Sequence, residues 1–195
     1  MGEELISIFH FLNPDILVDT HTSNGADYQY TMTLLSTQLS KLNPKVSELI
    51  STKLLPVIHT EMSNKGYPIC PYVNTMKTTP ESGIYDYLET PRYCTGYAAL
   101  FNTIGFTTET HMWKPFSERV QSTFEFLNTI QSYANVHSSE IIAVRKSAFE
   151  FQHNQDNFPI SWKLDTAQFE MIEFLGYESE KYVSEVTGLE TFKYN

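Results

Sequence analysis

The order of apolar and polar residues divides the chain into amphipathic helices and short strands. Apolar side chains recur at helical spacing and predict helices over residues 3–12, 44–64, 115–133 and 138–152, with a shorter helix over 95–103. Runs rich in apolar or β-branched residues predict strands over residues 15–20, 28–35 and 104–110. Asn43 and Pro44 suit the start of the second helix, and Pro56 is expected to kink it. Strands that alternate with helices predict an α/β fold with a mixed, mostly parallel sheet flanked by helices.

The pattern changes after residue 152. Apolar and polar positions alternate as in half-buried strands, and they predict strands over residues 158–165, 168–175 and from 182 onward. We therefore divide the chain into residues 1–152, the α/β part, and residues 153–195, the start of an accessory β region. So short a region cannot form much of a core alone. It is expected to pack on the α/β part or to pair with another chain.

Composition and charge exclude some classes of function. The hydrophobic share of 41% and the aromatic share of 14% are enough to build a core. The net charge of −10 argues against binding to nucleic acid, which requires a basic face, and against docking on an anionic membrane. No apolar run approaches the ~20 residues of a membrane span. Two cysteines are too few for a cysteine zinc site.

Two predicted strands end in residues that suit catalysis. One ends in Asp19-Thr20-His21, before a loop predicted from His21 to Gly25, and the other ends in Thr108-Glu109-Thr110-His111. In open α/β sheets, ligands bind outside the carboxyl ends of strands. A histidine and a glutamate there would serve a metal-assisted hydrolase, in which a glutamate takes a proton from metal-bound water. Alternatively, His21 is structural, Glu109 is a solvated carboxylate, and Asp19 either orients the imidazole or caps the strand end.

Two segments resemble a known family. "NPDILVDTHTSNGADYQY" and, further on, "PRYCTGYAALFNTIGFTTETHMWKPFSERV" are similar to the carboxyl-terminal half of the catalytic domain of bacterial zinc carboxypeptidases, over roughly residues 5–135. The resemblance implies that residues 1–152 are the C-terminal part of such a domain. It also implies that His21 is a zinc ligand and that Glu109 is the general base. A mobile tyrosine that contacts substrate would be Tyr87, Tyr93 or Tyr97.

Arg92 lies beside these tyrosines in the sequence and is a candidate for binding a substrate carboxylate through two hydrogen bonds. The alternative is an exposed arginine paired with Glu89. The resemblance further implies a peptide or small amide substrate, and a secreted or periplasmic parent protein.

The family's His-x-x-Glu zinc motif is missing upstream of His21. His137-Ser-Ser-Glu140 has the spacing, but it follows Glu109 at a predicted helix start. We therefore expect the chain to be a fragment of a longer hydrolase, inactive alone and without stoichiometric zinc, although zinc would be the cofactor of the parent. The alternatives are a zinc amidohydrolase or deacylase of small molecules or cell-wall peptides, and a non-catalytic binding module with the same fold. An exposed sheet edge would favour a homo-oligomer.

Overall fold

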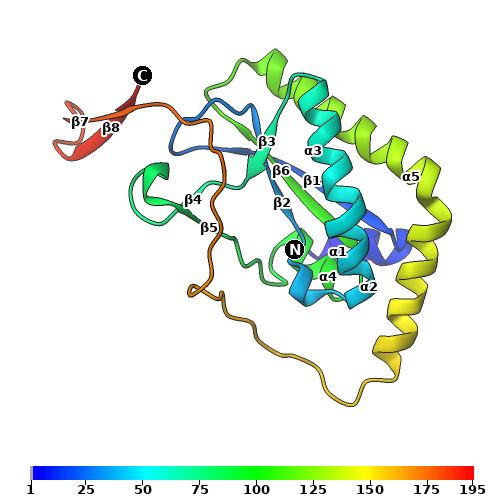
Figure 1. Ribbon diagram of the computed structural model, residues 1–195. Coiled ribbons are helices and arrows are strands. Elements are labelled where there is room, and N and C mark those ends of the chain that lie inside the picture. Colours follow the sequence, from blue (N-terminus) through cyan, green and yellow to red (C-terminus); the bar gives the residue numbers. More distant parts are fainter. Residues whose placement is uncertain (1) are drawn as a thin grey trace.

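The computed structural model describes residues 2–195 and has a mixed α/β fold built on a four-stranded sheet (Figure 1). The strand order is β1-β6-β2-β3. β1 is parallel to β6 and β2 is parallel to β3, whereas β2 runs antiparallel to β6. The strands are β1 (Ile16–Ser23), β2 (Met32–Ser36), β3 (Ile69–Pro71) and β6 (Ile104–His111). The predicted α/β architecture with a mixed sheet is therefore confirmed.

The two faces of the sheet differ in character, because successive side chains of a strand point to opposite faces. One face carries Met32, Leu34, Ile104 and Phe106, which form the hydrophobic core with the helices that cover it. These helices are α2 (Pro44–Leu49), α3 (Leu55–Asn64) and α5 (Phe116–His153) (Figure 1). The alternate residues of the same strands, polar for the most part, point to the opposite face.

The short helix α4 (Cys94–Ala99) covers this opposite face at Gly105. A Cβ atom at Gly105 would lie 2.6 Å from Thr37 Oγ1 and 3.1 Å from the Thr95 backbone. Only glycine allows so close an approach of the helix to the strand. The irregular segment that precedes α4 contains the 3₁₀ turn η3 (Pro80–Ser82) and the two-stranded sheet of β4 (Asn74–Thr75) and β5 (Ile84–Tyr85).

The second predicted helix begins as expected. The Asn43 side chain accepts a hydrogen bond from the backbone nitrogen of Lys45 at 3.0 Å, and Pro44 occupies the first turn. The five-residue π-helical turn η2 (Ile50–Leu54) precedes α3 and places Pro56 in the first turn of α3. Proline lacks a backbone N–H, so a π turn accommodates it within a continuous helical path.

Strand β1 differs from the strand predicted over residues 15–20. The sequence predicts a buried strand followed by a loop that begins at His21. In the structure β1 pairs with β6 residue for residue, from Ile16 with Ile104 to Ser23 with His111, so His21 lies inside the strand. β1 is also an edge strand of the sheet. Its first four residues are half-buried and Thr20 to Thr22 are exposed. The sequence pattern does not reveal this, because only the strand order decides which strand lies at the edge.

Two further predicted helices are joined in the structure. Residues 115–133 and 138–152 fall within the single helix α5, which is interrupted by non-helical backbone angles at His137 (φ −110°, ψ 16°). The predicted break therefore exists as a kink. The predicted helix over residues 3–12 is confirmed as α1 (Glu3–Leu12). The 3₁₀ turn η1 (Leu39–Lys41) links β2 to α2. No helix within residues 2–195 is long and apolar enough to cross a membrane.

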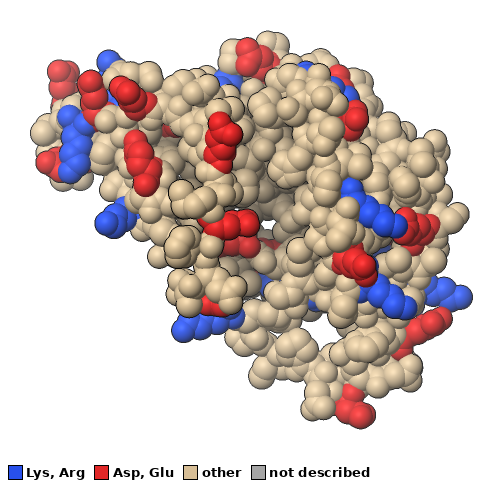
Figure 2. Space-filling model, viewed as in Figure 1, with Lys and Arg blue, Asp and Glu red and all other residues tan. Residues whose placement is uncertain are grey.

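The strands predicted over residues 158–165 and 168–175 are wrong. This segment runs along the body without regular strand pairing, and the terminal hairpin consists of β7 (Ser179–Val183) and β8 (Glu190–Tyr194) (Figure 1). Alternating polarity does not make a strand where no neighbouring strand is available. The segment is held to the body at Gln29, whose backbone nitrogen donates to the Leu175 oxygen at 2.9 Å. Figure 2 shows acidic side chains gathered over the hairpin and a hollow between this segment and the body.

Candidate active site

His21 and Glu109 face each other across the pairing of β1 with β6. The two residues are register partners on parallel strands, so their side chains leave the same face of the sheet. His21 Nδ1 lies 3.5 Å from Glu109 Oε1. Asp19, two residues earlier in β1, shares that face, and its Oδ2 atom lies 3.0 Å from His21 Nε2. The imidazole is therefore flanked by a carboxylate at each ring nitrogen.

These three residues lie in a cavity of about 190 Å³ on the polar face of the sheet. The cavity is lined by Asp19, His21, Leu35, Tyr72, Tyr87, Glu89, Tyr93, Thr95, Thr107 and Glu109. Of the three candidate tyrosines, Tyr87 and Tyr93 border the cavity. Tyr97 does not, because its hydroxyl lies 2.8 Å from His10 Nε2 and its ring packs against Phe9 and Phe101. Arg92 is exposed at the surface and does not line the cavity.

The environment of Glu109 shifts the pKa of its carboxyl. Burial raises the pKa of this carboxyl, the nearby His21 lowers it, and the negative charge of Asp19 raises it again. A carboxylate with a raised pKa is a stronger base than an ordinary surface glutamate. Which ring nitrogen of His21 donates and which accepts depends on the tautomer of the imidazole.

Two further groups, Tyr87 in the cavity wall and Cys94 beside it, have raised pKa values and stay in their neutral forms. Burial and the adjacent Tyr93 hydroxyl raise the pKa of Tyr87 to about 12. Burial and a hydrogen bond with Asp19 raise the pKa of Cys94 to about 11. A phenol at this position is a hydrogen-bond donor, and a protonated thiol is not a nucleophile. Acid–base chemistry here therefore depends on the carboxyl groups and His21.

His111, which ends β6, does not belong to the cavity. Its side chain is fully buried, and Nε2 lies 3.1 Å from the Ala26 carbonyl oxygen. The ring packs edge-on against Tyr28 and Trp113. Burial lowers the pKa of this imidazole, so His111 is a neutral structural residue.

The donor set does not by itself fit a zinc site. A catalytic zinc is held by three protein ligands, and within residues 2–195 no group of three or more His, Cys, Asp or Glu side chains is placed to hold a metal ion. Both ring nitrogens of His21 already face carboxylates. We therefore assign no chemical step of this chain to a metal.

Sequence reasoning missed Glu89 as a cavity residue. Its side chain is 3% exposed, and Oε1 accepts a hydrogen bond from the backbone nitrogen of Gln38 at 3.1 Å. Burial raises the pKa of this carboxyl. Tyr72, which follows β3, was missed as well. Both residues lie in or beside the irregular segment that precedes α4. A long irregular segment is more often functional than idle, and this is the sequence signal that could have indicated them.

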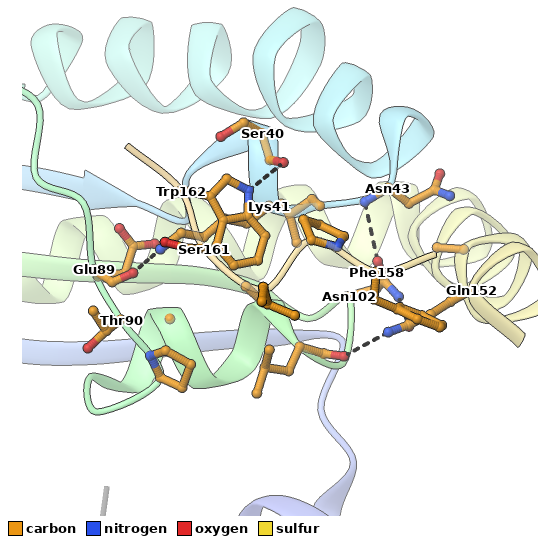
Figure 3. Close-up of a pocket in the computed structure, with 18 of the residues that line it drawn as sticks. Ser40, Lys41, Asn43, Glu89, Thr90, Asn102, Gln152, Phe158, Ser161 and Trp162 are labelled. Carbon is orange, nitrogen blue, oxygen red and sulfur yellow. Dashed lines mark hydrogen bonds between the residues drawn. The ribbon is translucent and has the colours of Figure 1, made fainter. Parts of the chain in front are cut away.

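A larger cavity of about 660 Å³, which Glu89 also lines, lies between the body and the segment that follows α5 (Figure 3). Several of its polar side chains form hydrogen bonds with each other or with the backbone. Asn102 accepts from the backbone nitrogen of Asn43 and donates to Gln152, and the Trp162 indole donates to the Ser40 carbonyl oxygen. Lys41 reaches the backbone oxygen of Glu89. No pair like that of His21 and Glu109 is present among its lining residues, so the smaller cavity is the stronger candidate for a functional site.

Comparison with known proteins adds no family assignment, because no protein-family model, curated protein or solved structure matches this chain.

Proposed function

We propose that the cavity around His21 and Glu109 is the acid–base part of a hydrolase site that cleaves a peptide or amide bond. One observation carries the proposal: the buried carboxylate of Glu109 lies 3.5 Å from a ring nitrogen of the half-exposed His21, at the wall of a cavity. A buried carboxyl with a raised pKa beside an imidazole is typical of a catalytic acid–base pair.

In this proposal Glu109 is the general base. Its carboxylate takes one proton from a water molecule while the water oxygen forms a bond to the carbonyl carbon of the substrate. The carbon–nitrogen bond then breaks, and Glu109 returns that proton to the leaving nitrogen. The products are a carboxylic acid and an amine. His21 holds the Glu109 carboxylate in place, and Asp19 fixes the orientation of the imidazole.

The resemblance to zinc carboxypeptidases supports the same reaction and matches His21 to one zinc ligand. The remaining ligands would have to come from outside the described residues, since three are required. We therefore expect the 195-residue chain alone to bind no stoichiometric zinc. Elemental analysis of the purified chain tests this expectation, and one tightly bound zinc per chain would contradict it.

The functional test is the Glu109→Gln substitution in the natural polypeptide that contains these residues. Glutamine keeps the shape of the side chain but cannot accept a proton, so hydrolysis of N-acylated dipeptides, with free and amidated carboxyl termini, is expected to fall about 10²-fold or more. Glu118→Gln is the matched control, because Glu118 is exposed in the first turn of α5. Unchanged hydrolysis in Glu109→Gln would overturn the proposal and favour a non-catalytic binding module.

A further inference from the structure

The charges that line the His21–Glu109 cavity are predominantly negative. Three carboxylates border it, those of Asp19, Glu89 and Glu109, and one imidazole lies among them. Its ten lining residues include no lysine and no arginine. A cavity with this lining repels an anionic substrate group and attracts a cationic one, and the low-dielectric walls strengthen the effect.

Among the three carboxylates, Glu89 is the one placed to bind a cationic group of a ligand. Asp19 and Glu109 are both engaged with His21, whereas Glu89 comes from a different segment of the chain. Its carboxylate accepts hydrogen bonds from two backbone N–H groups, that of Gln38, which donates to Oε1 at 3.1 Å, and that of Glu89 itself. The neighbouring Lys41 ammonium donates to the backbone carbonyl of Glu89 (Figure 3). A carboxylate has about four acceptor positions, so Glu89 can accept further hydrogen bonds from a bound cation.

The aromatic walls suit the same ligand. Tyr87 packs edge-on between Tyr72 and Tyr93, with ring centroids 5.9 and 5.5 Å apart. The face of a tyrosine ring attracts an ammonium or guanidinium group. The ring also offers apolar surface against which the aliphatic part of a lysine or arginine side chain can pack. The volume of about 190 Å³ is below the roughly 300–1,000 Å³ of sites for drug-sized ligands. The cavity therefore has room for a single side-chain-sized group.

We propose that this cavity selects a substrate residue that carries an amine or guanidinium, with Glu89 as its specificity-determining residue. The inference rests on the proposed hydrolase function for its biological role, but the binding that it describes does not require hydrolysis. It also differs from the expectation for Arg92, because it assigns recognition to a cation of the substrate and not to a carboxylate.

Binding of two matched probes tests the inference on the unmodified chain. The probes are Nα-acetyl-L-lysine amide and Nα-acetyl-L-norleucine amide, which differ in the charged amine. Titration followed by NMR is expected to show lysine amide binding about tenfold more tightly or better, because a charge-assisted hydrogen bond is lost with norleucine. Equal affinities for the two probes would overturn the inference without the need for any variant.

Glu89→Gln then assigns the effect to one side chain. The glutamine carbonyl oxygen can still accept from the Gln38 nitrogen, so the local fold is expected to persist while the preference for the lysine probe is lost. Glu118→Gln is the matched control and should keep the preference. A preference that survives in Glu89→Gln contradicts the role of Glu89. If the lysine preference depends on Glu89 while Glu109→Gln hydrolyses normally, the proposed function fails and the binding inference stands. If Glu109→Gln loses hydrolysis while the two probes bind equally well, the binding inference fails and the proposed function stands.

Discussion

The two faces of the central sheet use the same strands for different purposes. On one face, Phe106 is fully buried against Phe126 of α5, with ring centroids 5.9 Å apart. On the other face, the neighbouring residues Thr107 and Glu109 border a cavity. Packing on the first face stabilises the fold, whereas the second face keeps a polar hollow beneath α4 and the irregular segment before it. The difference predicts that substitutions on the two faces separate stability from chemistry.

The largest loss of stability is expected on the apolar face. Phe106→Ala removes a fully buried ring and leaves a cavity in the core, so the free energy of unfolding should fall by about 3–5 kcal/mol. Urea unfolding followed by circular dichroism measures the change. A loss below about 1 kcal/mol would show that this face does not carry the stability of the domain.

A smaller loss of stability is expected where α5 forms hydrogen bonds with the residues that precede β1. Arg145 is 6% exposed and donates to the Asn13 carbonyl and side-chain oxygens at 3.2 and 2.7 Å and to Asp15 at 3.1 Å. Arg145→Met should lower the free energy of unfolding by about 2 kcal/mol, since it removes the charge-assisted hydrogen bonds that the buried guanidinium group donates. Lys146→Met, on the exposed side of α5, is the control and should change little.

On the side of the polar face, a single hydroxyl helps to hold the segment that follows α5. The Tyr30 hydroxyl accepts from the Leu175 nitrogen at 3.1 Å and donates to the Glu173 oxygen at 3.4 Å. Tyr30→Phe should lower stability by about 1 kcal/mol and loosen residues 173–176 first. Limited proteolysis checks the location: faster cleavage there, with the body intact, agrees with this attachment, and unchanged cleavage does not.

The smallest expected effect is a change with pH. Burial raises the pKa of Glu89 in the folded protein, so between its unfolded and folded values the folded state binds more protons than the unfolded state. Its contribution to stability is therefore lost as pH rises through that window. Glu89→Gln cannot ionise, so its stability relative to the unmodified protein should be higher at pH 7 than at pH 4. Parallel urea titrations at the two pH values measure the difference. A relative stability that falls between pH 4 and pH 7 would contradict a raised pKa of the buried Glu89 carboxyl.

Local signals predicted the parts of the fold that depend on neighbours in sequence. Helical periodicity gave the bounds of α1, and the N-cap of Asn43 follows from its own side chain and the next two residues. The placement of His21 and Glu109 at the carboxyl ends of two strands was also readable, because parallel strands bring these ends together. Glu89 was not readable as a cavity residue, because its position depends on Gln38, which lies 51 residues away in sequence. The edge position of β1 and the unpaired course of residues 158–175 likewise depend on which strands find partners.

The central claim is that the polar face carries an acid–base site with Glu109 as its base. The most direct test measures kcat/KM and the free energy of unfolding together in Glu109→Gln, in the natural polypeptide that contains these residues. The account predicts that hydrolysis falls about 10²-fold or more while stability is unchanged or higher, because the substitution removes a buried ionisable carboxyl whose pKa is raised. Hydrolysis that persists at the level of the Glu118→Gln control would contradict the account.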